Sequence, residues 1–202
     1  MSRYDAVLFD FDGVLVDSEP IHYGCWIEIL HPFGVELDWQ TYAENCIGIT
    51  DRAMLSFLCS LSKQPLNIET LYAEYPRKKD MFRERMSLIG IAPEMKALLQ
   101  ELRPDYKLAV VTSSNIREVG SILEAAELTP LLDTIVHGGE VERHKPAPDP
   151  YRIAMERLKA TKGLAAEDSA AGIASARAAG LDVVPIPASS QVCSLVRAAL
   201  KT

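Results

Sequence analysis

Five short apolar segments stand out along the chain, at residues 6–9, 108–111, 134–136, 163–166 and 183–186. They are continuous apolar runs rather than alternating ones, which is typical of strands buried on both faces of a sheet. From residue 93 onward they alternate with segments of helical pattern, joined by short connections. This alternation predicts an α/β fold, a parallel sheet with helices on both faces. Pro185 within the fifth segment indicates a strand at the edge of the sheet.

Residues 18–86 break this rhythm, because they contain several helical patterns and no convincing strand. Ser18 before Pro20 is a good helix start, and Asn67 followed by Glu69 is another. The economical interpretation is a helical insertion between the first strand and the rest of the sheet. We therefore expect a core from residues 1–17 and 87–202, closed by a helix in the last dozen residues, and a helical domain over 18–86.

Polar residues follow four of the five predicted strands. Because the carboxyl ends of parallel strands form the usual ligand-binding edge, we expect these residues to converge. They are, in chain order, Asp10-Phe11-Asp12-Gly13, Thr112-Ser113-Ser114-Asn115, His144-Lys145-Pro146 and Glu167-Asp168-Ser169.

The chemistry of this set is that of phosphoryl transfer. Asp10, Glu167 and Asp168 supply hard oxygen ligands that suit Mg²⁺, which completes its shell with waters and a substrate phosphate oxygen. Lys145 adds a second positive charge. Thr112 and the backbone amides of Ser113 and Ser114 are candidate hydrogen-bond donors to the phosphate. Positioned donors and cations are the main requirement of this reaction.

The two aspartates after the first strand have different expected tasks. Asp10 is the candidate nucleophile, which would form an aspartyl-phosphate. Asp12 points to the same side of an extended chain, so it could protonate the leaving oxygen and then deprotonate the attacking water. Gly13 lets the chain turn sharply away beside the substrate.

Composition narrows the class of partner. The formal net charge of −7 and the pI of about 5.2 argue against binding to nucleic acid or to an anionic membrane. No apolar run approaches membrane-spanning length, and the N-terminus lacks the features of a signal peptide. The four cysteines have no Cys-x-x-Cys spacing, so we interpret them as reduced, mostly buried thiols. We expect a cytoplasmic protein, and the fold is compatible with a monomer.

The chain resembles the haloacid dehalogenase-like hydrolase superfamily, and within it the β-phosphoglucomutase and sugar-phosphatase branch. The matching segments are DFDGVLVDSEPIH (10–22), VVTSS (110–114), HKPAPDPY (144–151) and EDSAAGIASARAAG (167–180). The resemblance implies a Rossmann-like core with a helical cap inserted after the first strand. It implies Asp10 as nucleophile, Asp12 as acid-base whose carbonyl also contacts Mg²⁺, and Thr112 and Lys145 as phosphate ligands. Asp168, with Glu167 nearby, matches the metal-binding acids.

The resemblance also indicates which cap residues could contact the substrate. Glu19 and His22 lie at the cap entrance. The segment Gly48-Ile49-Thr50-Asp51-Arg52 resembles the family's cap loop, which Arg52 ends. Lys78 matches a cap lysine that mutases keep for the distal phosphate. Each has a simpler interpretation: His22 as a partly exposed helix residue, Arg52 as the partner of a nearby acid, and 77–79 as a solvated helix face. Trp26 and Trp39 are expected in the cap core.

The function predicted first is a Mg²⁺-dependent phosphatase acting on a small phosphorylated metabolite, a sugar phosphate above all. The alternative is a β-phosphoglucomutase-type enzyme, in which a sugar hydroxyl replaces water. A haloacid dehalogenase is disfavoured by Asp12, because those enzymes lack a second aspartate in this motif. A non-enzymatic binding protein is disfavoured by the complete set of catalytic residue types.

Overall fold

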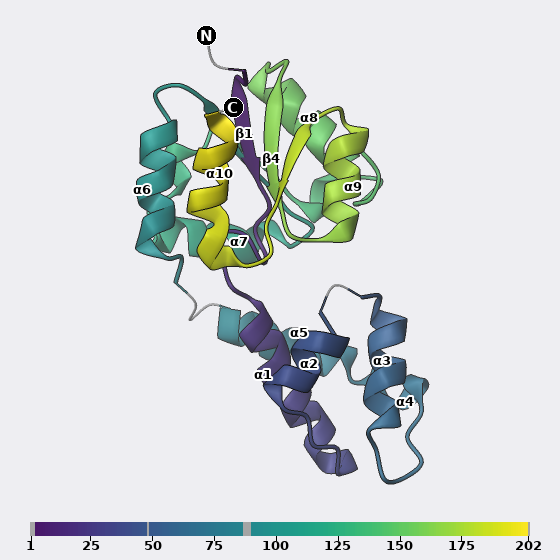
Figure 1. The fold of residues 1–202 in the computed structure, drawn as a ribbon. Helices are drawn as coiled ribbons and strands as arrows, with labels where there is room; N and C mark the ends of the chain where they lie inside the picture. Colours follow the sequence, from purple (N-terminus) through teal and green to yellow (C-terminus); the bar gives the residue numbers. More distant parts are fainter. Residues whose placement is uncertain (1–2, 48, 87–89, 202) are drawn as a thin grey trace. The chain divides into compact units, whose positions relative to one another are not determined.

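The computed structural model describes residues 3–47, 49–86 and 90–201 (Figure 1). The chain divides into two compact units. One consists of Met1–Asp17 with Ile89–Thr202, and the other is Ser18–Leu88. The helical domain predicted from the sequence spans 18–86, and the second compact unit spans Ser18–Leu88.

The first unit contains a five-stranded parallel sheet in the order β3-β2-β1-β4-β5. The predicted α/β fold is therefore confirmed. The bounds of each predicted strand segment agree with those of an observed strand to within one residue. The strands are β1 (Ala6–Phe9), β2 (Lys107–Val111), β3 (Thr134–Val136), β4 (Gly163–Glu167) and β5 (Asp182–Pro185). Strand β5 is an edge strand, as Pro185 indicates, and Pro185 is the register partner of Glu167.

The central strands are buried on both faces. Every residue of β1 and β4 is buried, which accounts for their continuous apolar runs. The helices of this unit are α6 (Pro93–Leu102), α7 (Ile116–Ala125), α8 (Asp149–Leu158), α9 (Ala170–Ala178) and α10 (Val192–Leu200). Short 3₁₀ helices occupy Thr129–Leu131, Gly138–Glu140 and Ser189–Gln191. The closing helix predicted for the last dozen residues is α10.

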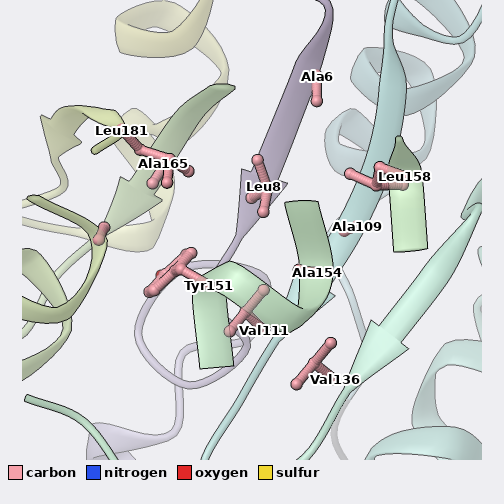
Figure 2. Close-up of a cluster of buried hydrophobic side chains, with 11 residues drawn as sticks. Ala6, Leu8, Ala109, Val111, Val136, Tyr151, Ala154, Leu158, Ala165 and Leu181 are labelled. Atoms are coloured by element: carbon pink, nitrogen blue, oxygen red, sulfur yellow. The ribbon is translucent and has the colours of Figure 1, made fainter. Parts of the chain in front are cut away.

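One face of the sheet packs against α8 and α9. Ala6 and Leu8 of β1 join one buried cluster with Tyr151 of α8 and Ala176 of α9 (Figure 2). Burying side chains of this kind contributes roughly 1.5–3 kcal/mol each for the larger aliphatic and aromatic ones. This layer matters for the site, because it fixes α8 and the start of α9 against the carboxyl ends of β1 and β4.

The second unit is helical throughout its assigned elements. Its helices are α1 (Glu19–Leu30), α2 (Trp39–Asn45), α3 (Asp51–Ser60), α4 (Ile68–Ala73) and α5 (Tyr75–Met86), with a 3₁₀ turn at His31–Phe33. Asn67 caps α4 by accepting from the Thr70 amide at 2.8 Å. Ser18 stands at the N-cap of α1 without a side-chain cap. The helical pattern over 67–86 forms two helices, because Pro76 cannot donate the bond that would continue α4.

The core of the second unit contains Trp26, which is buried, but not Trp39. Trp39 is 44% exposed, so its expected place in the core was wrong. It is the first residue of α2, and its ring makes a T-shaped contact with Tyr23 and a tilted contact with Tyr42. Residues at helix starts have fewer neighbours than those in the middle turns.

All four cysteines are free thiols, two of them buried. Within the described residues no helix combines the length and hydrophobicity needed to cross a membrane.

Candidate active site

The turn after β1 positions the two aspartates. The Asp10 amide donates to the Ala166 carbonyl of β4 at 3.0 Å, so Asp10 still follows the sheet. The chain then reverses: the amide of Gly13 donates to the Val16 carbonyl at 2.8 Å, and Gly13 has φ +72°. A residue with a Cβ would be strained in this left-handed conformation. That Cβ would also collide with the carboxyl group of Asp168. Gly13 is therefore required for the turn to lie beside the acid that follows β4.

Lys145 lies between the carboxylates of Asp10 and Glu167. Its Nζ is 2.9 Å from Asp10 Oδ1 and 2.5 Å from Glu167 Oε1. It also donates to the Val111 carbonyl of β2 at 3.0 Å. The side chains of Lys145 and Asp10 are 6% and 10% exposed, and that of Glu167 is fully buried. Burial lowers the pKa of Lys145, but the carboxyls of Asp10 and Glu167 outweigh it and raise this pKa above its usual value. Lys145 is therefore a permanent cation in the site.

Glu167 is held by several donors. Besides Lys145, Tyr151 donates its hydroxyl proton to Oε1 at 2.7 Å, and Ser169 donates its hydroxyl to Oε2 at 3.2 Å. The start of α9 packs directly on this carboxylate, where a Cβ on Gly172 would collide with it. Amide groups at a helix N-terminus favour a negative charge. These contacts keep a buried carboxylate in place.

The donor set fits a divalent metal ion. Carboxylate oxygens of Asp10, Glu167 and Asp168 lie within 4.8 Å of one another. Burial and the charge of Glu167 raise the pKa of Asp168 to about 6. Burial, together with the neighbouring Glu167 and Asp12 carboxylates, raises the pKa of Asp10 to about 8 against the opposing effect of Lys145. Crowded carboxylates of this kind are what a bound Mg²⁺ neutralises. Both oxygens of Glu167 are engaged by protein donors. The donors to Asp10, from Lys145 and from the Phe11 amide, both meet its Oδ1. Asp10 Oδ2 and the Asp168 carboxylate are therefore the more accessible ligands.

The loop after β2 faces the acid-base candidate. Ser114 donates its hydroxyl to Asp12 Oδ2 at 2.7 Å. The Ser114 amide, expected as a phosphate donor, donates instead to Thr112 Oγ1 at 3.0 Å. Thr112 is buried and its hydroxyl proton is not used in that bond, so it keeps its expected donor capacity. Ser113 is exposed, and its carbonyl lies so close to Gly138 that a Cβ there would overlap it. Ser114 thus contacts the candidate acid-base rather than presenting its amide.

The second unit brings together two of the predicted cap residues. His22 of α1 and Lys78 of α5 are 56 positions apart, and Lys78 Nζ lies 2.5 Å from His22 Nδ1. Burial and the Lys78 charge lower the pKa of His22 to about 3, so the imidazole is neutral and can accept this bond. The His22 ring also stacks on Phe82 with centroids 4.1 Å apart. His22 is a half-buried residue of α1 with a specific polar partner, and Lys78 is half-buried rather than fully solvated on α5.

The other two predicted cap residues are Glu19, one turn before His22 on α1, and Arg52 of α3. Glu19 accepts from the Tyr42 hydroxyl at 2.9 Å. Arg52 is exposed in the first turn of α3, one residue after Asp51. Gly48, which begins the predicted cap loop, lies outside the described residues.

Sequence reasoning did not single out Tyr151 and Ser169, although both contact Glu167. Tyr151 is the last residue of the HKPAPDPY segment, and its ring there predicts a buried position on a helix. Ser169 reads as the N-cap of α9, and it is: its hydroxyl accepts from the Gly172 amide at 3.0 Å. The available signal was spacing, since Tyr151 lies six residues after Lys145, in the first turn of α8.

Comparison with known proteins agrees with the fold described above. Residues 7–186 match the haloacid dehalogenase-like hydrolase family model. The chain therefore belongs to this family, and the resemblance seen in the sequence is confirmed.

Two relatives and one solved structure illustrate the similarity. The chain is 29% identical over 188 residues to the fructose-1-phosphate phosphatase YqaB of Escherichia coli, covering 91% of this chain and 97% of the relative. It is 29% identical over 186 residues to a phosphorylated carbohydrates phosphatase of Thermotoga maritima, covering 88% and 82% of the two chains. The crystal structure of CbbY from Rhodobacter sphaeroides in complex with phosphate is 28% identical, with a TM-score of 0.61 and coverages of 90% and 86%.

The raised carboxyl pKa values predict how Mg²⁺ stabilisation depends on pH. A carboxyl whose pKa is higher in the folded state stabilises the fold while protonated, and this contribution is lost as the pH rises through the folded-state pKa. That window runs from about pH 4 to about pH 6 for Asp168 and to about pH 8 for Asp10. Mg²⁺ binds the ionised form, so it should raise the melting temperature more at pH 8 than at pH 5.5. At pH 8 and a hundredfold excess over Kd, we expect a shift of about 5–10 °C by calorimetry.

The Asp168→Asn variant is the control, because it removes one ligand and one raised pKa. Its Mg²⁺-induced shift at pH 8 should be much smaller than that of the parent. An equal shift at both pH values in the parent would contradict the assignment of the metal to these carboxyls.

The contact between α9 and Glu167 predicts opposite effects for two Gly→Ala changes. Gly172→Ala places a methyl group on a buried carboxylate, so it should lower stability by about 1–3 kcal/mol and impair the site. Gly120→Ala in α7 meets no atom within 4 Å and should be neutral or stabilising by about 0.5–1 kcal/mol, since alanine favours a helix. Urea unfolding of both variants checks this, and equal effects would contradict it.

Proposed function

We propose that this protein is a Mg²⁺-dependent phosphatase that hydrolyses a sugar phosphate or a similar small phosphorylated metabolite through an aspartyl-phosphate. The observation that carries the proposal is the buried Lys145, which lies 2.9 Å from the candidate nucleophile Asp10 and 2.5 Å from Glu167. The named activities of the two phosphatase relatives support phosphorylated carbohydrates as the substrate class.

In the first step, a carboxylate oxygen of Asp10 forms a bond to phosphorus while the bond from phosphorus to the sugar oxygen breaks. Asp12 gives its proton to that leaving oxygen, which departs as an alcohol. In the second step a water oxygen bonds to phosphorus, Asp12 takes a proton from the water, and the Asp10 carboxylate is regenerated as phosphate leaves. Ser114 holds Asp12 Oδ2 through its hydroxyl at 2.7 Å, which orients the carboxyl for both transfers.

Charge is the main obstacle to the first step, because a carboxylate must approach a phosphate dianion. Lys145 supplies one fixed positive charge beside Asp10, in a site where burial strengthens its effect. Thr112 is placed to donate its hydroxyl to a phosphoryl oxygen. Mg²⁺, held by Asp10 and Asp168 with Glu167 and the Asp12 carbonyl as further candidates, would neutralise the remaining negative charge.

We further propose that the unit Ser18–Leu88 acts as the cap that selects the substrate. The His22–Lys78 pair offers a neutral imidazole and an ammonium group, and Glu19 and Arg52 offer opposite charges. These groups suit the hydroxyl and phosphate groups of a sugar phosphate, and cap closure would exclude bulk water from the acyl phosphate.

The test is release of inorganic phosphate from a panel of sugar phosphates and an aryl phosphate, with Mg²⁺ or with a chelator. We expect release that requires Mg²⁺ and that falls by at least about 10³-fold in Asp10→Asn, because the nucleophile is lost. Asp105→Asn, an exposed aspartate of the same unit, is the matched control and should retain full activity.

Two outcomes would contradict the proposal. Mg²⁺-dependent phosphate release that persists in Asp10→Asn would remove Asp10 from the mechanism. Conversion of glucose 1-phosphate to its isomer, with no phosphate released from any substrate, would favour the mutase alternative.

A further inference from the structure

Tyr151 contacts both charged partners at the centre of the candidate site. It is the third residue of α8 and is fully buried. Its hydroxyl donates to Glu167 Oε1 at 2.7 Å, and Lys145 Nζ lies 5.4 Å from the centre of its ring. Figure 2 shows the tyrosine among the apolar side chains of the layer between β1 and α8. The ring is thus fixed by packing, while its polar end reaches the ionic network.

The N–H groups of Lys145 are all engaged. An ammonium group has three donors, and those of Lys145 lie within bonding distance of Asp10 Oδ1, Glu167 Oε1 and the Val111 carbonyl. To contact a phosphoryl oxygen, Lys145 must share or redirect the donor that now faces Asp10. The bonds to Glu167 and to the Val111 carbonyl hold the ammonium in place while that donor is redirected.

The strength of the Lys145–Glu167 bond depends on what else Glu167 Oε1 accepts. In the structure this oxygen accepts from both Lys145 and Tyr151. The Tyr151 hydroxyl therefore compensates part of the negative charge of Glu167. Without it, Lys145 alone would compensate the charge on this oxygen. Without that hydroxyl, a fully buried carboxylate oxygen keeps only one donor, and its attraction for the ammonium increases.

We propose that Tyr151 is a positioning residue, whose hydroxyl balances Glu167 so that Lys145 remains directed toward Asp10 and the transferring phosphoryl group. Loss of the hydroxyl draws the ammonium toward Glu167 and away from the reacting atoms. This inference rests on the proposed phosphatase function for its kinetic consequence, but not for its structural one.

The test uses Tyr151→Phe, which keeps the ring beneath Lys145 and removes only the hydroxyl. Mutating a hydrogen-bond partner of a metal-ligating histidine or carboxylate typically costs 10–100-fold in metal affinity or activity. We expect kcat to fall about tenfold with KM changed by less than about twofold, because the lost contact acts mainly on the developing charge of the transition state. Tyr4→Phe is the matched control, since Tyr4 is also buried and donates its hydroxyl to a carboxylate, that of Asp182, at 2.9 Å.

A second readout does not require turnover. The ammonium protons of a buried, fully bonded lysine exchange slowly enough to be observed by ¹H–¹⁵N NMR, and Lys145→Met assigns the signal. We expect this signal to shift in Tyr151→Phe and to stay in place in Tyr4→Phe. If the wild-type protein releases no phosphate, the proposed function fails, and the NMR comparison alone judges the role of Tyr151.

An unmoved Lys145 signal in Tyr151→Phe overturns the inference, whatever the activity. So does a kcat equal to that of the wild type in an active enzyme. A fall in kcat that is accompanied by an unmoved signal and a lower melting temperature would assign Tyr151 a purely structural role.

Discussion

The rest of the site depends on one constraint: a lysine buried between two carboxylates must have its charge compensated on both sides. Lys145 lies between Asp10 and Glu167, and none of the three side chains is more than 10% exposed. A buried charge without a partner is costly, and removing one member of such a pair typically destabilises a protein by about 3–5 kcal/mol. Because Asp10 follows β1, Glu167 ends β4 and Lys145 lies in the loop that leads from β3 to α8, the ionic contact joins two strand ends to that loop.

The neighbouring backbone is arranged to let these charges meet. Gly13 turns the chain away from β1 with a positive φ and leaves room for Asp168, and Gly172 lets the start of α9 lie against Glu167. The small residues of β4 likewise allow neighbouring elements to pack closely. Ala165 belongs to the buried cluster that packs under α8 and α9. A strand poor in β-branched residues is stable here because it is paired on both sides, with β1 and with β5. The small residues of β4 are explained by the close packing of helices against this strand rather than by strand propensity.

The fold and the charged residues of the site could be predicted from the sequence because both depend on local sequence patterns. Continuous apolar runs define the strands, and an acid or a lysine directly after a strand must lie at the carboxyl edge of the sheet. The remaining features depend on side-chain packing between distant segments. The hydroxyl of Tyr151 reaches Glu167 from a helix face that periodicity assigns to the core, and His22 meets Lys78 across 56 residues. The Ser114 amide turns inward to Thr112, which residue type and spacing alone do not reveal.

Chemical capture of the phosphorylated enzyme is the decisive experiment on Asp10 as the nucleophile. During rapid turnover of an aryl phosphate with Mg²⁺, quenched enzyme is reduced with sodium borohydride, which converts an aspartyl-phosphate to homoserine, and the peptides are analysed by mass spectrometry. If Asp10 is the nucleophile, homoserine appears at position 10 only when substrate is present, and it is absent at positions 12 and 168. Phosphate release without homoserine at position 10, or with homoserine at another aspartate, would contradict this role of Asp10.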